Sequence, residues 1–139
     1  MQETFRILIA DRDHETRQSV ERALRLKWAH CEVIDTGDGT EALELCSRED
    51  LDLVVLAIDL AGLCGLEVLR QIRQHSRVPV LMLTAMGREV DVVRALEFGA
   101  DDCAPKDRYF ELIARARSVL RRTSSLPSRL GLACLTTGS

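Results

Sequence analysis

The sequence predicts an α/β protein: a doubly wound, five-stranded parallel sheet flanked by five helices. Three short, uninterrupted apolar runs occupy residues 6–10, 53–58 and 78–84. Such runs are typical of strands that are covered on both faces, as in a parallel sheet. Segments with helical spacing separate the runs, so strand and helix alternate five times. This alternation indicates right-handed crossovers in an open sheet, whose sites form at the carboxyl ends of the strands.

Weaker patterns complete the set of elements. Two further strands are expected at residues 31–36 and 102–105. The first four helices are expected at residues 13–27, 39–47, 66–75 and 89–98. The last helix has the clearest apolar spacing, at i, i+1, i+4, i+7 and i+8, through Leu112, Ile113, Ala116, Val119 and Leu120. The pattern stops near residue 123, where a Ser-rich stretch reads as a linker.

Composition favours one globular domain. The chain has 139 residues, 46% of them hydrophobic and 29% charged, and 19 Lys+Arg against 22 Asp+Glu give a net charge of −3. This balance excludes a disordered segment, and the mild acidic excess argues against nucleic-acid binding by this stretch itself. The five cysteines form no CxxC pair, so no zinc site or disulfide framework is predicted. Without a signal peptide or a membrane-spanning run, a cytoplasmic location is expected.

Residues suited to phosphate chemistry follow the predicted strands. Asp11 and Arg12 follow the first strand, Asp59 the third, Thr84 ends the fourth, and Lys106 follows the fifth. Because the carboxyl ends of parallel strands meet at one edge, we expect acids, a hydroxyl and an ammonium group to converge there.

Several stretches in the same order make the chain resemble the receiver domain of bacterial two-component response regulators, a CheY-like, flavodoxin-like fold. The matching stretches are residues 7–11, 37–43, 52–56, 65–69, 80–85 and 99–102. The resemblance covers residues 6–122, and the end of the last helix is most similar to the OmpR/PhoB-type class. It implies a receiver domain over residues 1–122. Residues 123–139 are then a linker or tail, or the start of a missing DNA-binding effector domain.

The resemblance also assigns roles at the sheet edge. Receivers accept a phosphoryl group from a sensor kinase on an aspartate, and a divalent cation, a hydroxyl and a lysine neutralise the developing charge. Thr84 matches the switch hydroxyl, Lys106 the phosphate-binding lysine and Asp11 the first of two paired acids. Arg12 stands at the second acid, and Ala57 stands where the phosphorylated aspartate is expected. A methyl group cannot accept phosphate.

Two further departures lie near this edge. Cys103 replaces the usual switch aromatic, and Asp107 replaces the proline after the lysine. Together these differences favour natural loss of the phosphoryl chemistry over a single engineered change. We therefore expect an atypical, non-enzymatic signalling module in transcription regulation, with no metal or cofactor. Arg12 is hypothesised to fill the metal position and to pair with Asp11 or Asp59.

The alternative is a working phosphoacceptor that uses Asp59 with a weak Mg²⁺ site at Asp11 and Asp59. Asp59 lies two positions beyond Ala57, which is about 6 to 7 Å along an extended strand. Divalent-cation-dependent phosphorylation that is lost in Asp59→Ala would distinguish this alternative from the main prediction.

The resemblance to OmpR/PhoB-type receivers further implies a homodimer through the fourth helix, fifth strand and fifth helix. The expected dimer-face residues are Arg94, Glu97, Asp101, Asp102, Arg115 and Arg117. A two-fold interface needs self-complementary charge of this kind. The simpler reading is that the arginines of the last helix form a solvated face.

Overall fold

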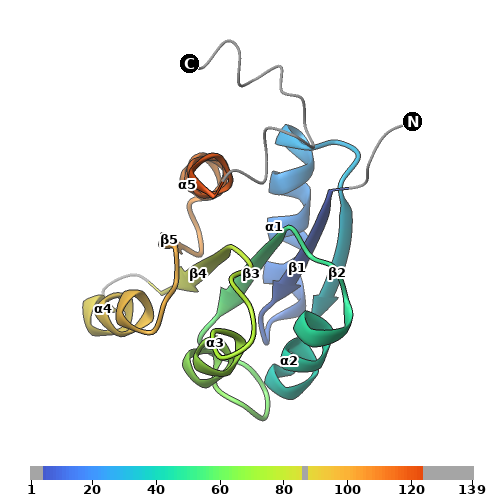
Figure 1. Cartoon of the computed structure of the whole chain (residues 1–139). Helices are drawn as coiled ribbons and strands as arrows, with labels where there is room; N and C mark the ends of the chain where they lie inside the picture. Colours follow the sequence, from blue (N-terminus) through green and yellow to red (C-terminus); the bar gives the residue numbers. More distant parts are fainter. Residues whose placement is uncertain (1–4, 86–87, 124–139) are drawn as a thin grey trace.

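Five parallel strands form one sheet, as predicted, and their order is β2-β1-β3-β4-β5 (Figure 1). The structure is a computed structural model, and it describes residues 5–85 and 88–123. The strands are β1 (Arg6–Ala10), β2 (Glu32–Thr36), β3 (Leu53–Ala57), β4 (Val80–Thr84) and β5 (Asp102–Pro105). The order reverses direction between β1 and β3, which is where open α/β sheets place their sites.

Helices cover both faces of the sheet (Figure 1). They are α1 (His14–Lys27), α2 (Gly39–Arg48), α3 (Gly65–Ile72), α4 (Glu89–Glu97) and α5 (Tyr109–Arg122). The apolar sides of α1 and α5 share one core cluster, and those of α2, α3 and α4 share the other. In β1, Ile7 and Ile9 point into the first cluster and Leu8 and Ala10 into the second. This alternation explains why a strand that is buried on both faces of the sheet appears in the sequence as a continuous apolar run.

Several element boundaries differ from the predicted ones by a few residues, and three of these differences have clear local reasons. Strand β4 begins at Val80 rather than at residue 78, because Pro79 has no N–H to give to a ladder. Strand β3 ends at Ala57, and the carbonyl of Ile58 accepts the Gly65 N–H instead, at 2.8 Å. Helix α3 ends at Ile72, after which i→i−3 hydrogen bonds tighten the chain.

The helix faces agree with the predicted spacing. In α5, Leu112, Ala116, Val119 and Leu120 are buried, and Ile113 is half-buried. Of the predicted linker or tail at residues 123–139, residues 124–139 lie outside the described residues, so the domain boundary remains a prediction. Within the described part of the chain, no helix has the length and apolarity needed to cross a membrane.

Candidate functional site at the carboxyl edge of the sheet

The sheet register brings the predicted site residues to one edge. Asp11 directly follows β1, Ala57 ends β3 opposite Leu83 of β4, and Thr84 ends β4 opposite Pro105 of β5. Lys106 follows β5, and its N–H donates to the Thr84 carbonyl at 3.1 Å. The convergence predicted from the strand order is therefore present.

An ion pair at this edge joins Asp11 and Lys106. Asp11 is 1% exposed, and its Oδ2 atom lies 3.0 Å from Nζ of Lys106. Oδ1 accepts the Asp13 N–H at 2.9 Å. Among the described residues Oδ2 accepts no hydrogen bond of standard geometry, so the ammonium group is what balances its charge. The carboxylate thus has an internal cation as its partner.

A side chain that the sequence analysis did not single out fixes the loop after β1. The Arg17 guanidinium, on α1, donates to the Asp11 carbonyl at 2.8 Å and pairs with the Asp35 carboxylate at 2.6 Å. A second, longer bond of 3.4 Å reaches the Arg12 carbonyl. Arg17 lies one helical turn beyond the Asp13 N-cap, so it faces the loop that the helix follows. That spacing was the only signal in the sequence.

Asp13 is the N-cap residue of α1. Its carboxylate accepts a hydrogen bond from the Thr16 hydroxyl at 2.8 Å. This hydrogen bond lowers the pKa of Asp13. Asp13 therefore has a structural role at the helix start.

The hypothesis that Arg12 pairs with Asp11 or Asp59 is wrong. The Arg12 side chain is exposed, and none of the ion pairs within residues 5–85 and 88–123 includes it. Its backbone N–H instead donates to the Asp59 carbonyl at 3.2 Å. The reason is that Lys106 already neutralises Asp11, and the Asp59 side chain is itself solvated. Arg12 places a guanidinium at the rim of the site rather than inside it.

The end of β3 carries no side chain that can attack phosphorus. Ala57 is fully buried, and α3 packs directly against its backbone. A Cβ atom on Gly65 would lie 1.9 Å from the Ala57 carbonyl oxygen, so only glycine permits this approach. Asp52 lies at the other end of β3, about 16 Å from Ala57 at 3.3 Å per residue, and its carboxylate accepts the Arg6 N–H at 2.9 Å.

Thr84 and Cys103 occupy their predicted positions as buried residues. The Thr84 hydroxyl lies 3.5 Å from the Ala104 carbonyl, which is a long hydrogen bond. Cys103 is 8% exposed, and burial raises the pKa of its thiol to about 11. A protonated, packed thiol agrees with a core role at this position and not with a redox-sensitive one.

The residues at this edge do not fit a divalent cation. Mg²⁺ prefers several hard oxygen ligands. By the resemblance, Arg12 stands at the position of the second acid and Ala57 at that of the acceptor, and Asp11 is ion-paired with Lys106. In the described stretches of chain, no group of three His, Cys, Asp or Glu residues is placed to hold a metal ion.

The predicted dimer-face residues divide into two groups. Asp102 pairs with Arg115 at 3.1 Å, and Asp101 pairs at 3.1 Å with Arg73, a residue the sequence analysis missed. Arg73 also donates hydrogen bonds to the carbonyls of Gly99 and Val78. The Asp101–Arg73 pair therefore stabilises loops within the chain. The second group, Arg94, Glu97 and Arg117, is exposed, with no ion pair within the described ranges.

Comparisons with known proteins agree with this fold. The family model described as response regulator receiver domain matches residues 7–117, and the chain belongs to this family. The "Transcriptional regulatory protein CpxR homolog" of Haemophilus influenzae is 42% identical over 123 residues, covering 86% of this chain and 52% of that protein. The "DNA-binding response regulator MtrA" of Mycolicibacterium paratuberculosis is 41% identical over 126 residues, covering 90% of this chain and 55% of that protein.

The chain thus spans about half the length of these curated relatives, which are OmpR/PhoB-type regulators. Solved receiver domains share the fold. That of NtrX from Brucella abortus has a TM-score of 0.74 at 31% identity, covering 83% of this chain and 98% of that one. That of the Francisella response regulator 1452 has a TM-score of 0.77 at 27% identity, covering 86% of this chain and 99% of that one.

Proposed function

We propose that this chain is an atypical receiver that acts without accepting phosphate. The observation that carries the proposal is the pair of features at the sheet edge. The acceptor position holds the buried methyl group of Ala57, and the remaining acid, Asp11, is neutralised by Lys106. A carboxylate nucleophile and a cation to neutralise the phosphoryl oxygens are both needed for the transfer. Ala57 supplies no carboxylate, and the ammonium group of Lys106 is already paired with Asp11.

Control of transcription through protein contacts is the output we assign to it. The relatives' names describe transcriptional and DNA-binding regulators, and each is about twice as long as the matched region. We infer that this receiver regulates an effector domain, which supplies any DNA contact. Its input is then a partner protein, such as a sensor kinase, or dimer formation, either of which shifts a conformational equilibrium.

A homodimer through α4, β5 and α5 is part of the same proposal. Arg94, Glu97 and Arg117 supply exposed charges of both signs on this face. Each exposed pair across an interface contributes about 0 to 1 kcal/mol, so these charges set register more than affinity. Sedimentation of the chain over a range of concentrations measures this dimer directly.

Intact-mass measurement tests the loss of phosphorylation. The protein is incubated with Mg²⁺ and acetyl phosphate beside an Asp59→Ala control, with an active receiver domain as a positive control. We expect no added phosphoryl mass in either variant of this chain. A phosphoryl mass that appears in the unaltered chain and disappears in Asp59→Ala establishes the alternative acceptor and overturns the proposal.

A further inference from the structure

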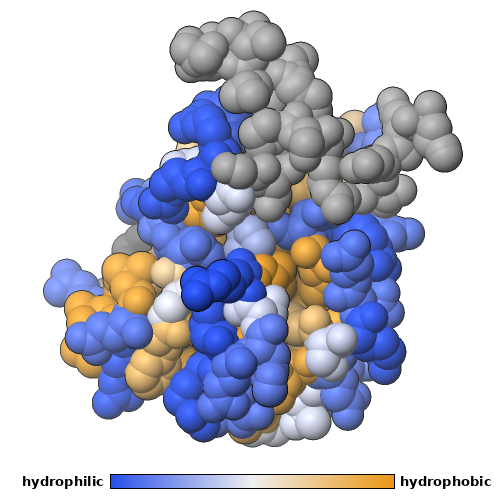
Figure 2. All heavy atoms as spheres, viewed as in Figure 1, coloured by the Kyte–Doolittle hydropathy of each residue, from blue (hydrophilic) through white to orange (hydrophobic). Residues whose placement is uncertain are grey.

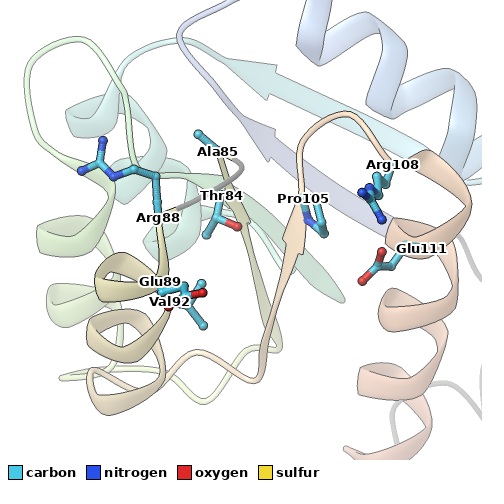
Figure 3. Close-up of a pocket in the computed structure, with 8 residues that line it drawn as sticks. All are labelled: Thr84, Ala85, Arg88, Glu89, Val92, Pro105, Arg108 and Glu111. Carbon is cyan, nitrogen blue, oxygen red and sulfur yellow. The ribbon is translucent and has the colours of Figure 1, made fainter.

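A pocket of about 280 Å³ opens at the carboxyl edge of the sheet, between the N-terminal ends of α4 and α5 (Figure 3). Figure 3 places Glu89 and Val92 on the α4 side of this pocket and Arg108 on the α5 side, with Thr84 and Pro105 between them. The volume lies just below the usual range for drug-sized ligands, about 300 to 1,000 Å³, so it suits a smaller organic molecule.

The most buried residue of the lining carries a polar group that the chain itself uses little. Thr84 is 6% exposed, and among the described residues its hydroxyl makes one hydrogen bond, a long one of 3.5 Å to the Ala104 carbonyl. A hydroxyl group has one donor and two acceptor sites, so this one can still bond to a ligand. Val92 and Pro105, both half-buried, add apolar surface to the lining. The recessed part of the pocket is therefore apolar with one available hydroxyl.

The charged residues of the lining divide into paired and unpaired ones. Arg88 and Glu111 each form an ion pair of 2.9 Å with a residue three or four positions further along the chain. Glu89 and Arg108 are exposed, and neither side chain makes a hydrogen bond or an ion pair within residues 5–85 and 88–123. One acid on the α4 side and one base on the α5 side are thus available to a ligand.

The exposed apolar surface of α4 is separate from this pocket. Val90 and Val93 are 68% and 54% exposed, and neither belongs to the lining. Figure 2 shows apolar side chains gathered over α4. Exposed apolar surface of this kind suits a protein partner. It does not account for the hydroxyl and the two opposite charges that the pocket presents.

We propose that this pocket binds a small zwitterion of the amino-acid type that carries an apolar side chain. Its ammonium group pairs with Glu89 and its carboxylate with Arg108, whose planar guanidinium matches the two oxygens of a carboxylate. Its apolar side chain contacts Val92 and Pro105, and the Thr84 hydroxyl adds a hydrogen bond. A ligand with a single charge leaves one of the two rim residues without a partner, so the zwitterion is the best match.

A ligand in this pocket lies next to the Asp11–Lys106 pair. The carbonyl of Thr84 accepts the Lys106 N–H at 3.1 Å, and Lys106 pairs with Asp11 at 3.0 Å. Because the ligand contacts both α4 and α5, it stabilises one arrangement of these helices and so shifts a conformational equilibrium. The inference goes beyond the proposed function by adding a small-molecule input, and it does not depend on the absence of phosphorylation.

Three matched probes separate the contributions of the two charges. L-leucine has both charges, isocaproate lacks the ammonium group, and isoamylamine lacks the carboxylate. Each probe is titrated into the isotope-labelled full chain while its amide resonances are recorded. L-leucine is expected to bind with a Kd of about 1 mM or lower and to shift the amides of Ala85 and Val92. The other two probes are expected to bind about fivefold more weakly, since each loses one exposed ion pair.

Charge-neutralising variants assign each contact. Arg108→Gln is expected to weaken L-leucine and isocaproate about fivefold and to leave isoamylamine unchanged. Glu89→Gln is expected to weaken L-leucine and isoamylamine by a similar factor and to leave isocaproate unchanged. Arg94→Gln and Glu97→Gln are the matched controls, because they remove exposed charges of α4 that lie outside the lining. Both controls are expected to bind all three probes as the unaltered chain does, and circular dichroism verifies the fold of each variant.

The outcomes decide this inference separately from the proposed function. Saturable L-leucine binding with the crossed pattern of variant effects supports it. Absence of saturable shifts with L-leucine overturns it, and so does L-leucine binding that either Arg108→Gln or Glu89→Gln leaves unchanged. Phosphorylation is measured by intact mass and not by these titrations, so either idea can fail while the other stands.

Discussion

Nζ of Lys106 lies 3.0 Å from Oδ2 of Asp11, and this ion pair joins the end of β5 to the end of β1 across the sheet edge. Asp11 is 1% exposed, whereas 30% of the Lys106 side chain is exposed. The resemblance to receivers implies that a metal ion and a phosphoryl group would bind near these two charges. In this chain the two charges contact each other directly, which leaves the edge electrically balanced without a ligand.

Lys106→Met is expected to destabilise the fold by about 1 to 3 kcal/mol, because it leaves the buried Asp11 carboxylate without a counter-charge. The figure is below that of a fully buried pair, since Lys106 is partly solvated. Asp11→Asn/Lys106→Met is expected to cost less than the sum of its single changes. Urea unfolding of the four proteins gives the coupling energy. Additive effects would contradict a direct interaction.

Restoring the family's acids is expected to restore part of the metal site. Arg12→Asp/Ala57→Asp adds two carboxylates beside Asp11 and removes the guanidinium that repels a divalent cation. Titration calorimetry should show a gain in Mg²⁺ affinity for the double variant and a smaller one for each single variant. The unaltered chain is the baseline. No gain in the double variant would show that the Asp11–Lys106 pair still excludes the metal.

Gly65→Ala is expected to be strongly destabilising, by roughly 2 to 4 kcal/mol, because the added methyl group meets the Ala57 backbone. A Cβ there would lie 1.9 Å from a carbonyl oxygen, and backbone atoms cannot move aside cheaply. Gly37→Ala is the control, since its nearest contact is the Arg17 guanidinium at 2.9 Å, a movable side-chain end. Thermal unfolding compares the two, and equal losses would contradict the packing argument.

Thiol reactivity should separate one exposed cysteine from the buried ones. Burial raises the pKa of Cys46 to about 12 and that of Cys103 to about 11. Only thiolates react, so at pH 8 about one in a thousand Cys103 thiols is reactive, and the fraction rises with pH. In Cys134→Ser, which removes the cysteine outside the described residues, a disulfide reagent should titrate one fast equivalent, from exposed Cys64. Loss of that equivalent in Cys64→Ser/Cys134→Ser checks the assignment, and a second fast equivalent would contradict it.

The alternation of apolar runs and helical spacing by itself determined the strand–helix order and, through it, the edge at which Asp11, Thr84 and Lys106 meet. A strand of a parallel sheet is buried on both faces, so it appears in the sequence as a continuous apolar run. The order of strands and helices can therefore be predicted from the sequence alone. The residues Arg12 and Ala57 can equally be read from the sequence, and their assignment to the acid and acceptor positions rests on the resemblance to receivers.

Tertiary structure alone decided which charges pair and which side chains stay exposed. The sequence offered Arg12 as the partner of Asp11, but the fold brings Lys106 within 3.0 Å and leaves Arg12 in solvent. It also pairs Asp101 with Arg73 and leaves Phe110 exposed. The sequence specifies the charge and the size of each side chain. The direction in which a long side chain points depends on neighbours that only the folded chain brings together.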